Sequence, residues 1–421
     1  MSDKVRTGLV RYVITCLILA VGAGFFSGVS QAGVLEEDRA DLLYFRYEGG
    51  GVTVNGPSVL VRKSVGDHVS VSANYMVDMV SSASIDVVVS GASPDRGGRY
   101  QDQRTQSSLT MDYLLGKSTY SVGYINSDES DYKAKTWYAS VSHDMFGDLT
   151  TISFGFKKGE NQVFKNFRDP ADGIKKNDPN FNDGLGVADM ESKSFNLGVS
   201  QIVTRNLILS GEYEVITDEG WLNSPYRSVR YLITPTEQGF QPEKYPNTHS
   251  SNAASIKGKY FLPWRAALDG SYRFYTDTWG VIGHTAELGY VHPLKTPWAG
   301  GDWIFEGRLH YYTQTAADFY ADLFPRADFS NFMARDKELS TYSGITGGLI
   351  ATYEFKIQRF PWLTKGQLNF RYDYMAINYD DFRDARYSTG HVDADLATAP
   401  GQEPLYELRA NMLQFYISAF F

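Results

Sequence analysis

The chain has 421 residues and a formal net charge of −9 at neutral pH. This acidic balance argues against a nucleic-acid-binding protein, whose binding face is usually basic. Cys16 is the only cysteine, so the sequence after it excludes disulfides, thiolate metal sites and covalent haem attachment. The 29 tyrosines, 25 phenylalanines and 39 glycines, with a mean hydropathy of −0.32, favour a membrane β-barrel with a polar interior.

The first 32 residues have the three parts of a secretory signal peptide. Basic residues come first, an apolar run over residues 13–26 follows, and the stretch Ser30-Gln31-Ala32 ends the pattern. We predict export with cleavage after Ala32. One domain over residues 33–421 follows, because no linker divides it. A membrane anchor is the alternative, but the glycines of the apolar run weaken a stable span and no second apolar segment exists.

Alternating apolar and polar residues begin after the acidic stretch Glu36-Glu37-Asp38 and continue to the end of the chain. Period-two alternation indicates β-strands, and the segment lengths suit tilted strands that cross a bilayer. We therefore predict an all-β fold, a transmembrane antiparallel up-and-down β-barrel of about 16 strands. The predicted strands are 42–48, 57–66, 69–79, 104–115, 118–127, 133–145, 150–160, 191–202, 206–217, 250–262, 265–276, 283–292, 302–313, 341–355, 367–378 and 405–421.

Connection lengths sort the predicted loops onto two sides of a membrane. Short turns such as 66–68, 116–117 and 203–205 alternate with long loops such as 161–190 and 218–249. Outer-membrane barrels have short periplasmic turns and long extracellular loops. A soluble β-sandwich would also alternate in its strands, but it gives no reason for this sorting. With both termini periplasmic, every long loop is extracellular.

Three Pro-Trp pairs, at 263–264, 297–298 and 361–362, fall in the predicted periplasmic turns. Proline ends a hydrogen-bonded ladder, and tryptophan prefers the boundary between membrane and water. The pairs therefore predict an aromatic girdle on the inner side of the membrane.

The last predicted strand ends the sequence on an aromatic residue. Leu413, Phe415, Ile417 and Phe421 share one face of this strand, and the pattern resembles the C-terminal signal by which the barrel-assembly machinery takes up its clients. We expect this face to contact outer-membrane lipids. We also expect the strand to pair with the first strand around residues 42–47, because an open edge in lipid would leave backbone groups unpaired.

Charged residues occupy the predicted inner faces of several strands. A hydrated lumen can accommodate them, whereas in a dry core each would cost several kcal/mol unless paired. Their mixed signs predict no simple ion selectivity. A salt-bridged lumen is the main interpretation, and a specific role in permeation is the alternative. The predicted lumen-lining residues are Asp269, Arg273, Glu287, Glu306, Arg308, His310, Arg371 and Asp373, with Asp112 and Glu354 also inward.

The run His249-Ser250-Ser251-Asn252 resembles the His-x-Ser-Asn run of the outer-membrane phospholipase. In that enzyme, the nucleophile and base face lipid, whereas the strand pattern here turns His249 and Ser251 inward. No Asn or Asp occurs in residues 253–268 to orient the histidine, as a catalytic triad requires. We expect a polar strand start and no enzymatic activity; an outer-membrane hydrolase is the alternative.

Two outer loops contain residue types that could bind metal. The stretch from Asp178 to Asp189 is close to a calcium loop, but its glycine is one place late, so a solvated loop is the expected structure. His391, Asp393 and Asp395 alternate in a later loop and form only a weak pattern. We predict no resident metal or cofactor. Three valines at 87–89 indicate that their loop folds over or into the barrel mouth.

Two blocks of sequence resemble a family of outer-membrane barrels catalogued only as a domain of unknown function (number 3570). The blocks are GGGVTVNGPSVLVRKSVGDHVSVSANYMVDMVSSASIDVV, residues 49–88, and YINSDESDYKAKTWYASVSHDMFGDLTTISFGF, residues 124–156. Members are often encoded beside a small lipoprotein, a thioredoxin-like protein and an FAD:protein FMN transferase. The resemblance implies a conduit or scaffold in an extracytosolic flavin-linked redox system. A small lipoprotein or flavinylated periplasmic protein is the implied partner, and a general diffusion porin or solute channel is the alternative.

Overall fold

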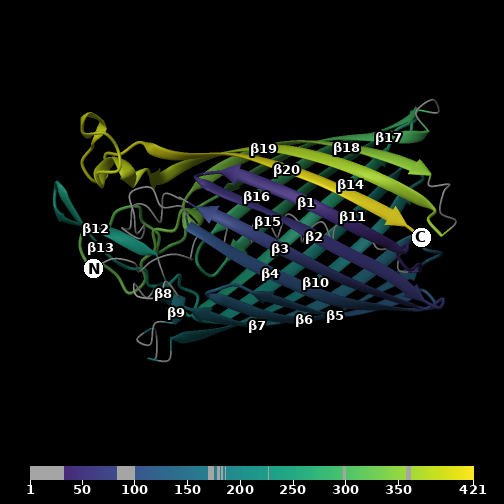
Figure 1. Cartoon of the computed structure of the whole chain (residues 1–421), viewed down its shortest axis with the longest axis horizontal. Coiled ribbons are helices and arrows are strands. Elements are labelled where there is room, and N and C mark those ends of the chain that lie inside the picture. The colour runs from purple at the N-terminus through teal and green to yellow at the C-terminus, as the bar shows by residue number, and fades with distance from the viewer. Residues whose placement is uncertain are drawn as a thin grey trace.

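The computed structural model describes residues 33–82, 100–168, 175–177, 181, 184, 186–225, 227–296, 300–356 and 362–421. Sixteen strands form one closed antiparallel barrel in which each wall strand pairs with the next wall strand along the chain, and β1 pairs with β20 (Figure 1). This confirms the predicted fold. The predicted signal peptide lies outside the described residues.

The wall strands run for 11 to 19 residues, so several extend beyond the membrane on the side of the long loops. Their bounds are β1 Arg39–Gly49, β2 Val52–Val65, β3 Val69–Ser82, β4 Tyr100–Leu115, β5 Ser118–Asp128, β6 Tyr132–Met145, β7 Thr150–Phe164, β10 Val187–Thr204, β11 Leu207–Gly220, β14 Thr248–Phe261, β15 Ala267–Asp277, β16 Ile282–Thr296, β17 Gly301–Gln314, β18 Tyr342–Lys356, β19 Lys365–Arg383 and β20 Leu405–Phe420.

The two faces of the wall differ as the alternation predicts. In β19, Phe370, Tyr372 and Tyr374 are exposed on the outside, whereas Asn369 and Asp373 on the inner face are buried. Exposed aromatic and aliphatic side chains on the outer face suit contact with lipid tails. The polar residues that alternate with them line the interior, where water and other polar groups can satisfy them.

Strand β20 closes the barrel against β1. Ile417 pairs with Leu42, and Phe415 pairs with Tyr44. Phe415 and Ile417 are 46% and 39% exposed on the outer face, as expected for residues that contact lipid. The predicted partner of the last strand and its predicted orientation agree with this arrangement. Closure leaves no strand edge of the wall unpaired in lipid.

The two ends of the barrel differ in the length of their connections. The C-terminus lies at the end with the short turns (Figure 1), which we call the inner end. Trp264 and Trp362 are exposed there, as the girdle prediction requires; the other Pro-Trp pair and Pro361 lie outside the described residues. No helix in the described part of the chain is long and apolar enough to cross a membrane.

The outer end carries structure that the sequence pattern missed. Two hairpins of short strands lie within the predicted loops 161–190 and 218–249, and three short 3₁₀ helices lie in later segments. These elements are β8 Asn166–Arg168 with β9 Lys175–Asn177, β12 Ser228–Thr234 with β13 Glu237–Pro242, and the helices η2 Lys337–Leu339, η3 Ala385–Ser388 and η4 Ala394–Leu396. Strands of three residues, such as β8 and β9, are too short to show alternation, and β12 and β13 lie outside the bilayer, where no apolar outer face is required.

Candidate functional site

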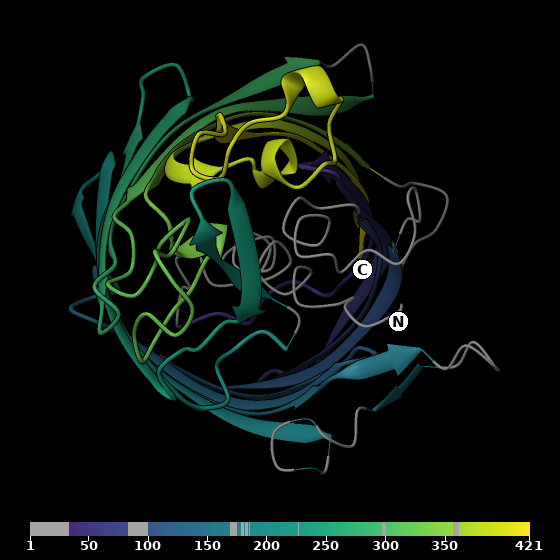
Figure 2. The same ribbon diagram turned by 90° about the vertical axis from the view of Figure 1, so that its left-hand side faces the viewer.

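Three segments from the outer end lie across part of the barrel opening (Figure 2). They are the β12–β13 hairpin, residues 315–341 and residues 384–404. Isolated backbone bridges join the hairpin and the residues that follow it to the second segment, pairing Tyr231 with Phe324 and Lys244 with Met333. The opening is therefore partly covered by segments that pair with one another.

The side chain of Arg230 lies where the three segments meet. It is 0% exposed, and its Nε donates to the backbone carbonyl of Asp322 at 2.8 Å. Its guanidinium also forms ion pairs with the carboxylates of Asp322 and Glu403. Each segment thus contributes one member of this ionic contact, because Arg230 belongs to β12, Asp322 to the second segment and Glu403 to the third.

A second arginine extends this network toward the barrel wall. Arg335 lies 3.0 Å from Asp322 Oδ1 and donates to the backbone carbonyl of Arg383 at 2.9 Å. Its guanidinium carbon lies 4.4 Å from the ring centre of Phe382, a cation–π contact. We call Arg230, Asp322, Arg335 and Glu403 the mouth cluster.

The charges in the mouth cluster stabilise one another. Burial alone would raise the pKa of Glu403, but the hydrogen bond and charge of Arg230 lower it below its ordinary value. Burial alone would lower the pKa of Arg230, but Asp322 and Glu403 raise it above its ordinary value. Both groups are therefore charged at neutral pH. Removing one partner of such a buried pair leaves the other uncompensated.

Apolar contacts fix the same segments below and beside the mouth cluster. Val229, Phe324 and Met333 form one buried group. A second group joins the β15–β16 turn to the covering segments and consists of Tyr245, Trp279, Val281, Ala317, Ala334 and Leu339. A third joins residues 382–385 to the inner wall of β1, β2, β19 and β20, and includes Phe45, Tyr47, Val54, Tyr379 and Tyr406. The covering segments are thus packed onto the wall on two sides.

The predicted lumen-lining residues lie on strand faces opposite the exposed apolar residues. Arg371 Nε donates to Asp373 Oδ2 at 2.6 Å, and Arg273 lies 3.3 Å from Glu214. The remaining contacts are an ion pair between Arg308 and Glu306, a 3.9 Å approach of His310 to Glu287, and close approach of the Asp269 carboxylate to Gly289. Pairs of opposite charge therefore cover this wall, and neither sign dominates.

Two glycines let carboxylates lie flat on that wall. A Cβ at Gly289 would lie 2.6 Å from the Asp269 carboxylate, and Gly289 pairs directly with Asp269 across β15 and β16. Gly348 has the same relation to Asp373 in β18 and β19. A larger residue at either position would displace the carboxylate.

His249 has both ring nitrogens engaged by carboxylates. Nδ1 lies 3.2 Å from Asp218 Oδ2, and Nε2 lies 3.0 Å from Asp277 Oδ2. A general base for Ser251 needs a free ring nitrogen directed at the hydroxyl and a single orienting carboxylate. The contacts of His249 join three neighbouring strands at the outer end and do not form a triad.

The other candidate sites are the two outer loops with possible metal ligands. Among the residues that the structure describes, no three or more His, Cys, Asp or Glu side chains lie close enough together to hold a metal ion. Half of the predicted calcium loop, including Asp178, lies outside the described residues. Asp189 lies at the start of β10 and accepts a hydrogen bond from Gln162 Nε2 at 3.3 Å. His391 Nδ1 lies 2.8 Å from the Thr389 hydroxyl. The three valines at 87–89 also lie outside the described residues.

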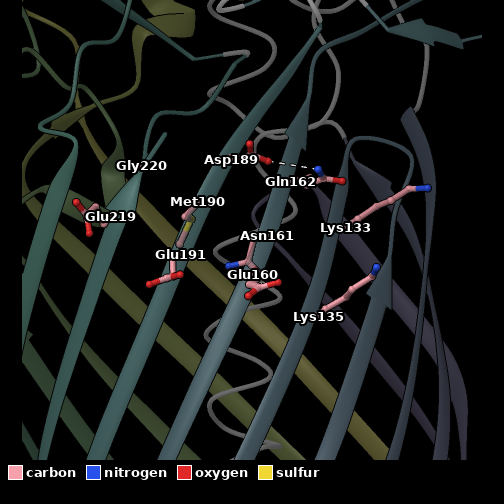
Figure 3. A pocket seen from close by; sticks show the side chains of 10 residues that line it. All are labelled: Lys133, Lys135, Glu160, Asn161, Gln162, Asp189, Met190, Glu191, Glu219 and Gly220. Carbon is pink, nitrogen blue, oxygen red and sulfur yellow. Dashed lines mark hydrogen bonds between the residues drawn. The ribbon is translucent and has the colours of Figure 1, made fainter.

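A hollow on the outer face marks the boundary of the apolar surface (Figure 3). It lies at the outer ends of β6, β7, β10 and β11, and Lys135, Glu160, Glu191 and Glu219 line it. These four residues form one cross-strand row. Two rows closer to the inner end, Phe156 and Phe195 pair across β7 and β10. The outer edge of the lipid-facing band therefore lies between these rows.

The closed wall of antiparallel strands, apolar outside and charged inside, defines a transmembrane β-barrel of the outer-membrane type. The sequence matches the family described as "Protein of unknown function (DUF3570)" over residues 85–394, which is most of the chain. The protein therefore belongs to this family. Of the two blocks that carry the resemblance, residues 124–156 lie inside the matched region, and most of residues 49–88 precede it.

Several solved outer-membrane proteins are similar in structure. One is a bacterial polysaccharide outer membrane secretin, with 7% identity, 92% of this chain and 100% of that chain covered, and a TM-score of 0.47. Another is the outer membrane protein OpdK from Pseudomonas aeruginosa, with 9% identity and a TM-score of 0.39. The match covers 91% of this chain and 100% of OpdK. OccK2 (OpdF) from the same organism has 7% identity and a TM-score of 0.37. The match covers 92% of this chain and 99% of OccK2. No curated protein matches the sequence.

Proposed function

We propose that the protein is a conduit for small polar solutes across the outer membrane and has no enzymatic activity. The observation that carries this proposal is the charged inner face of a closed barrel whose outer face is apolar. Opposite charges pair along the wall, as Arg371 does with Asp373. Such a wall favours polar solutes over apolar ones and selects weakly for the sign of charge.

The experiment is single-channel recording on the purified protein in planar bilayers. We expect open currents of low ion selectivity, and larger currents when the mouth cluster is broken by Arg230→Met. A barrel that stays silent both as wild type and as Arg230→Met would overturn the conduit and favour a scaffold. Exposed Lys244 offers a control, because its pair with Asp328 lies outside the mouth cluster; Lys244→Gln should leave the currents unchanged.

The finer part of the proposal concerns partners. Family resemblance supports a role as the barrel component of a flavin-linked redox system, in which a small lipoprotein or a flavinylated periplasmic protein binds the barrel. The chain after Cys16 contains no cysteine, so a covalent haem or a cysteine pair would have to reside on the partner. Purification in mild detergent tests this. A flavinylated or lipidated companion is expected, and a barrel recovered alone in repeated preparations would contradict it.

A further inference from the structure

The short segment before β1 lies against the inner wall at the inner end of the barrel. We call residues 33–38 the N-terminal lead. Glu36 lies 2.8 Å from Arg62, an inward residue of β2, and Glu37 lies 2.9 Å from Lys365. Asp38 accepts a hydrogen bond from the backbone N–H of Ser64 at 2.7 Å. Three consecutive acidic residues are therefore each engaged by the wall.

The first residue of this lead makes the most distant contact. The backbone nitrogen of Gly33 donates to Asp144 Oδ2 at 2.9 Å, and Asp144 lies on the inner face of β6. Asp144 is 5% exposed, and the other oxygen of its carboxylate accepts a hydrogen bond from the Thr151 hydroxyl at 2.5 Å. A buried carboxylate with one oxygen directed at a single backbone nitrogen is well placed to bind a cation there.

The sequence pattern places the predicted cleavage directly before this nitrogen. Hydrolysis by the leader peptidase would break the bond between the Ala32 carbonyl carbon and Gly33 nitrogen. Water would supply the hydroxyl to Ala32 and a proton to the new amine, which is an ammonium at neutral pH. We propose that processing after Ala32 converts the Gly33 amide contact into an ion pair between the new α-ammonium and Asp144, and that this pair fixes the N-terminal lead inside the inner end of the barrel.

The surroundings fit an ammonium better than an amide. An amide donates one hydrogen, whereas an ammonium donates three, and Ser142 lies two residues from Asp144 on the same face of β6. Its buried hydroxyl has no hydrogen-bond partner among the residues that the structure describes. Charge-assisted hydrogen bonds are also stronger than neutral ones. The site therefore offers an opposite charge to the processed terminus, with an unpartnered hydroxyl two residues along the same strand face.

Amine labelling of the folded, processed protein tests this site. N-terminal sequencing should start at Gly33, and an N-hydroxysuccinimide ester at pH 7 should label the α-amine at least about tenfold more slowly in the wild type than in Asp144→Asn, because a paired, buried ammonium is protected. The matched control is Asp148→Asn, whose carboxylate pairs with the exposed Lys117; it should label like the wild type.

A second variant covers the case in which Asp144→Asn fails to fold. A processed chain with one alanine added before Gly33 keeps Asp144 but moves the amine away from it, so faster labelling is expected. Mature protein that starts elsewhere, or a wild-type amine that labels as fast as in the extended chain, would overturn the proposal. Neither result bears on whether the barrel conducts solutes.

Discussion

Arg230 carries a charge into a part of the molecule that water does not reach. Arg230→Met leaves the buried carboxylate of Glu403 without its arginine partner, while Asp322 keeps Arg335; loss of such a buried partner destabilises the covering segments by about 3–5 kcal/mol. Hydrogen exchange should therefore speed up by at least about a hundredfold at bonds between the segments, such as the one from Leu232 N–H to the Phe324 carbonyl. The solvent-exposed pair of Lys244 and Asp328 provides the control, since Lys244→Gln should not change exchange measurably.

Ser251 is the only nucleophile that the sequence pattern offers for catalysis. Because both nitrogens of His249 are engaged by Asp218 and Asp277, the histidine cannot take a proton from Ser251. Ser251→Ala should therefore leave any background ester or phospholipid hydrolysis by the purified barrel unchanged. A loss of hydrolysis in this variant, with folding intact, would contradict the assignment of no enzymatic activity.

Individual strands were predictable because the bilayer imposes one rule on every one of them. Phe370 and Tyr372 had to face lipid, and Asn369 and Arg371 between them had to face inward, so alternation located each strand of the wall. The β12–β13 hairpin lies outside the bilayer, where no such rule applies, and it escaped prediction. Its bounds became clear only from its pairing.

The mouth cluster could not be found from the sequence for a different reason. Arg230 is separated from Asp322 by 92 positions and from Glu403 by 173. Each residue on its own resembles an ordinary solvated charge in a loop. The lumen pairs were easier to predict, because Arg371 and Asp373 lie two residues apart on one strand face.

The register of β20 makes a prediction about the closing strand. Phe415 faces lipid near the middle of its span, so Phe415→Lys should destabilise the folded barrel by about 2–4 kcal/mol. Met412→Lys places the same charge on the inner face, directly opposite Asp373, and should cost much less. Urea unfolding in lipid vesicles, followed by the electrophoretic shift of the folded barrel, measures both. An equal loss of unfolding free energy in the two variants would contradict this assignment of the faces of β20.

The whole molecule should respond to acid through its mouth. The pKa of Glu403 is lower in the folded state than in a free chain. Its contribution to the closed mouth is therefore complete above its ordinary pKa, about 4.3, and is lost as pH falls through the lowered value. Single-channel currents should increase reversibly as pH falls below about 4. Arg230→Met, which lacks the pair, should show no such transition, and an acid response of equal size in this variant would contradict the assignment.

The position of Glu403 in the chain also sets an order of events during assembly. Glu403 lies two residues before β20, the strand that closes the wall against β1. We expect Arg230 and Asp322 to gain this third partner late in folding, because closing contacts between residues far apart in the sequence is entropically costly. The covering segments of a nascent barrel should then be less protected from exchange than those of the finished protein. During insertion, the amides of the covering segments should become protected from hydrogen exchange only after those of the seam between β1 and β20.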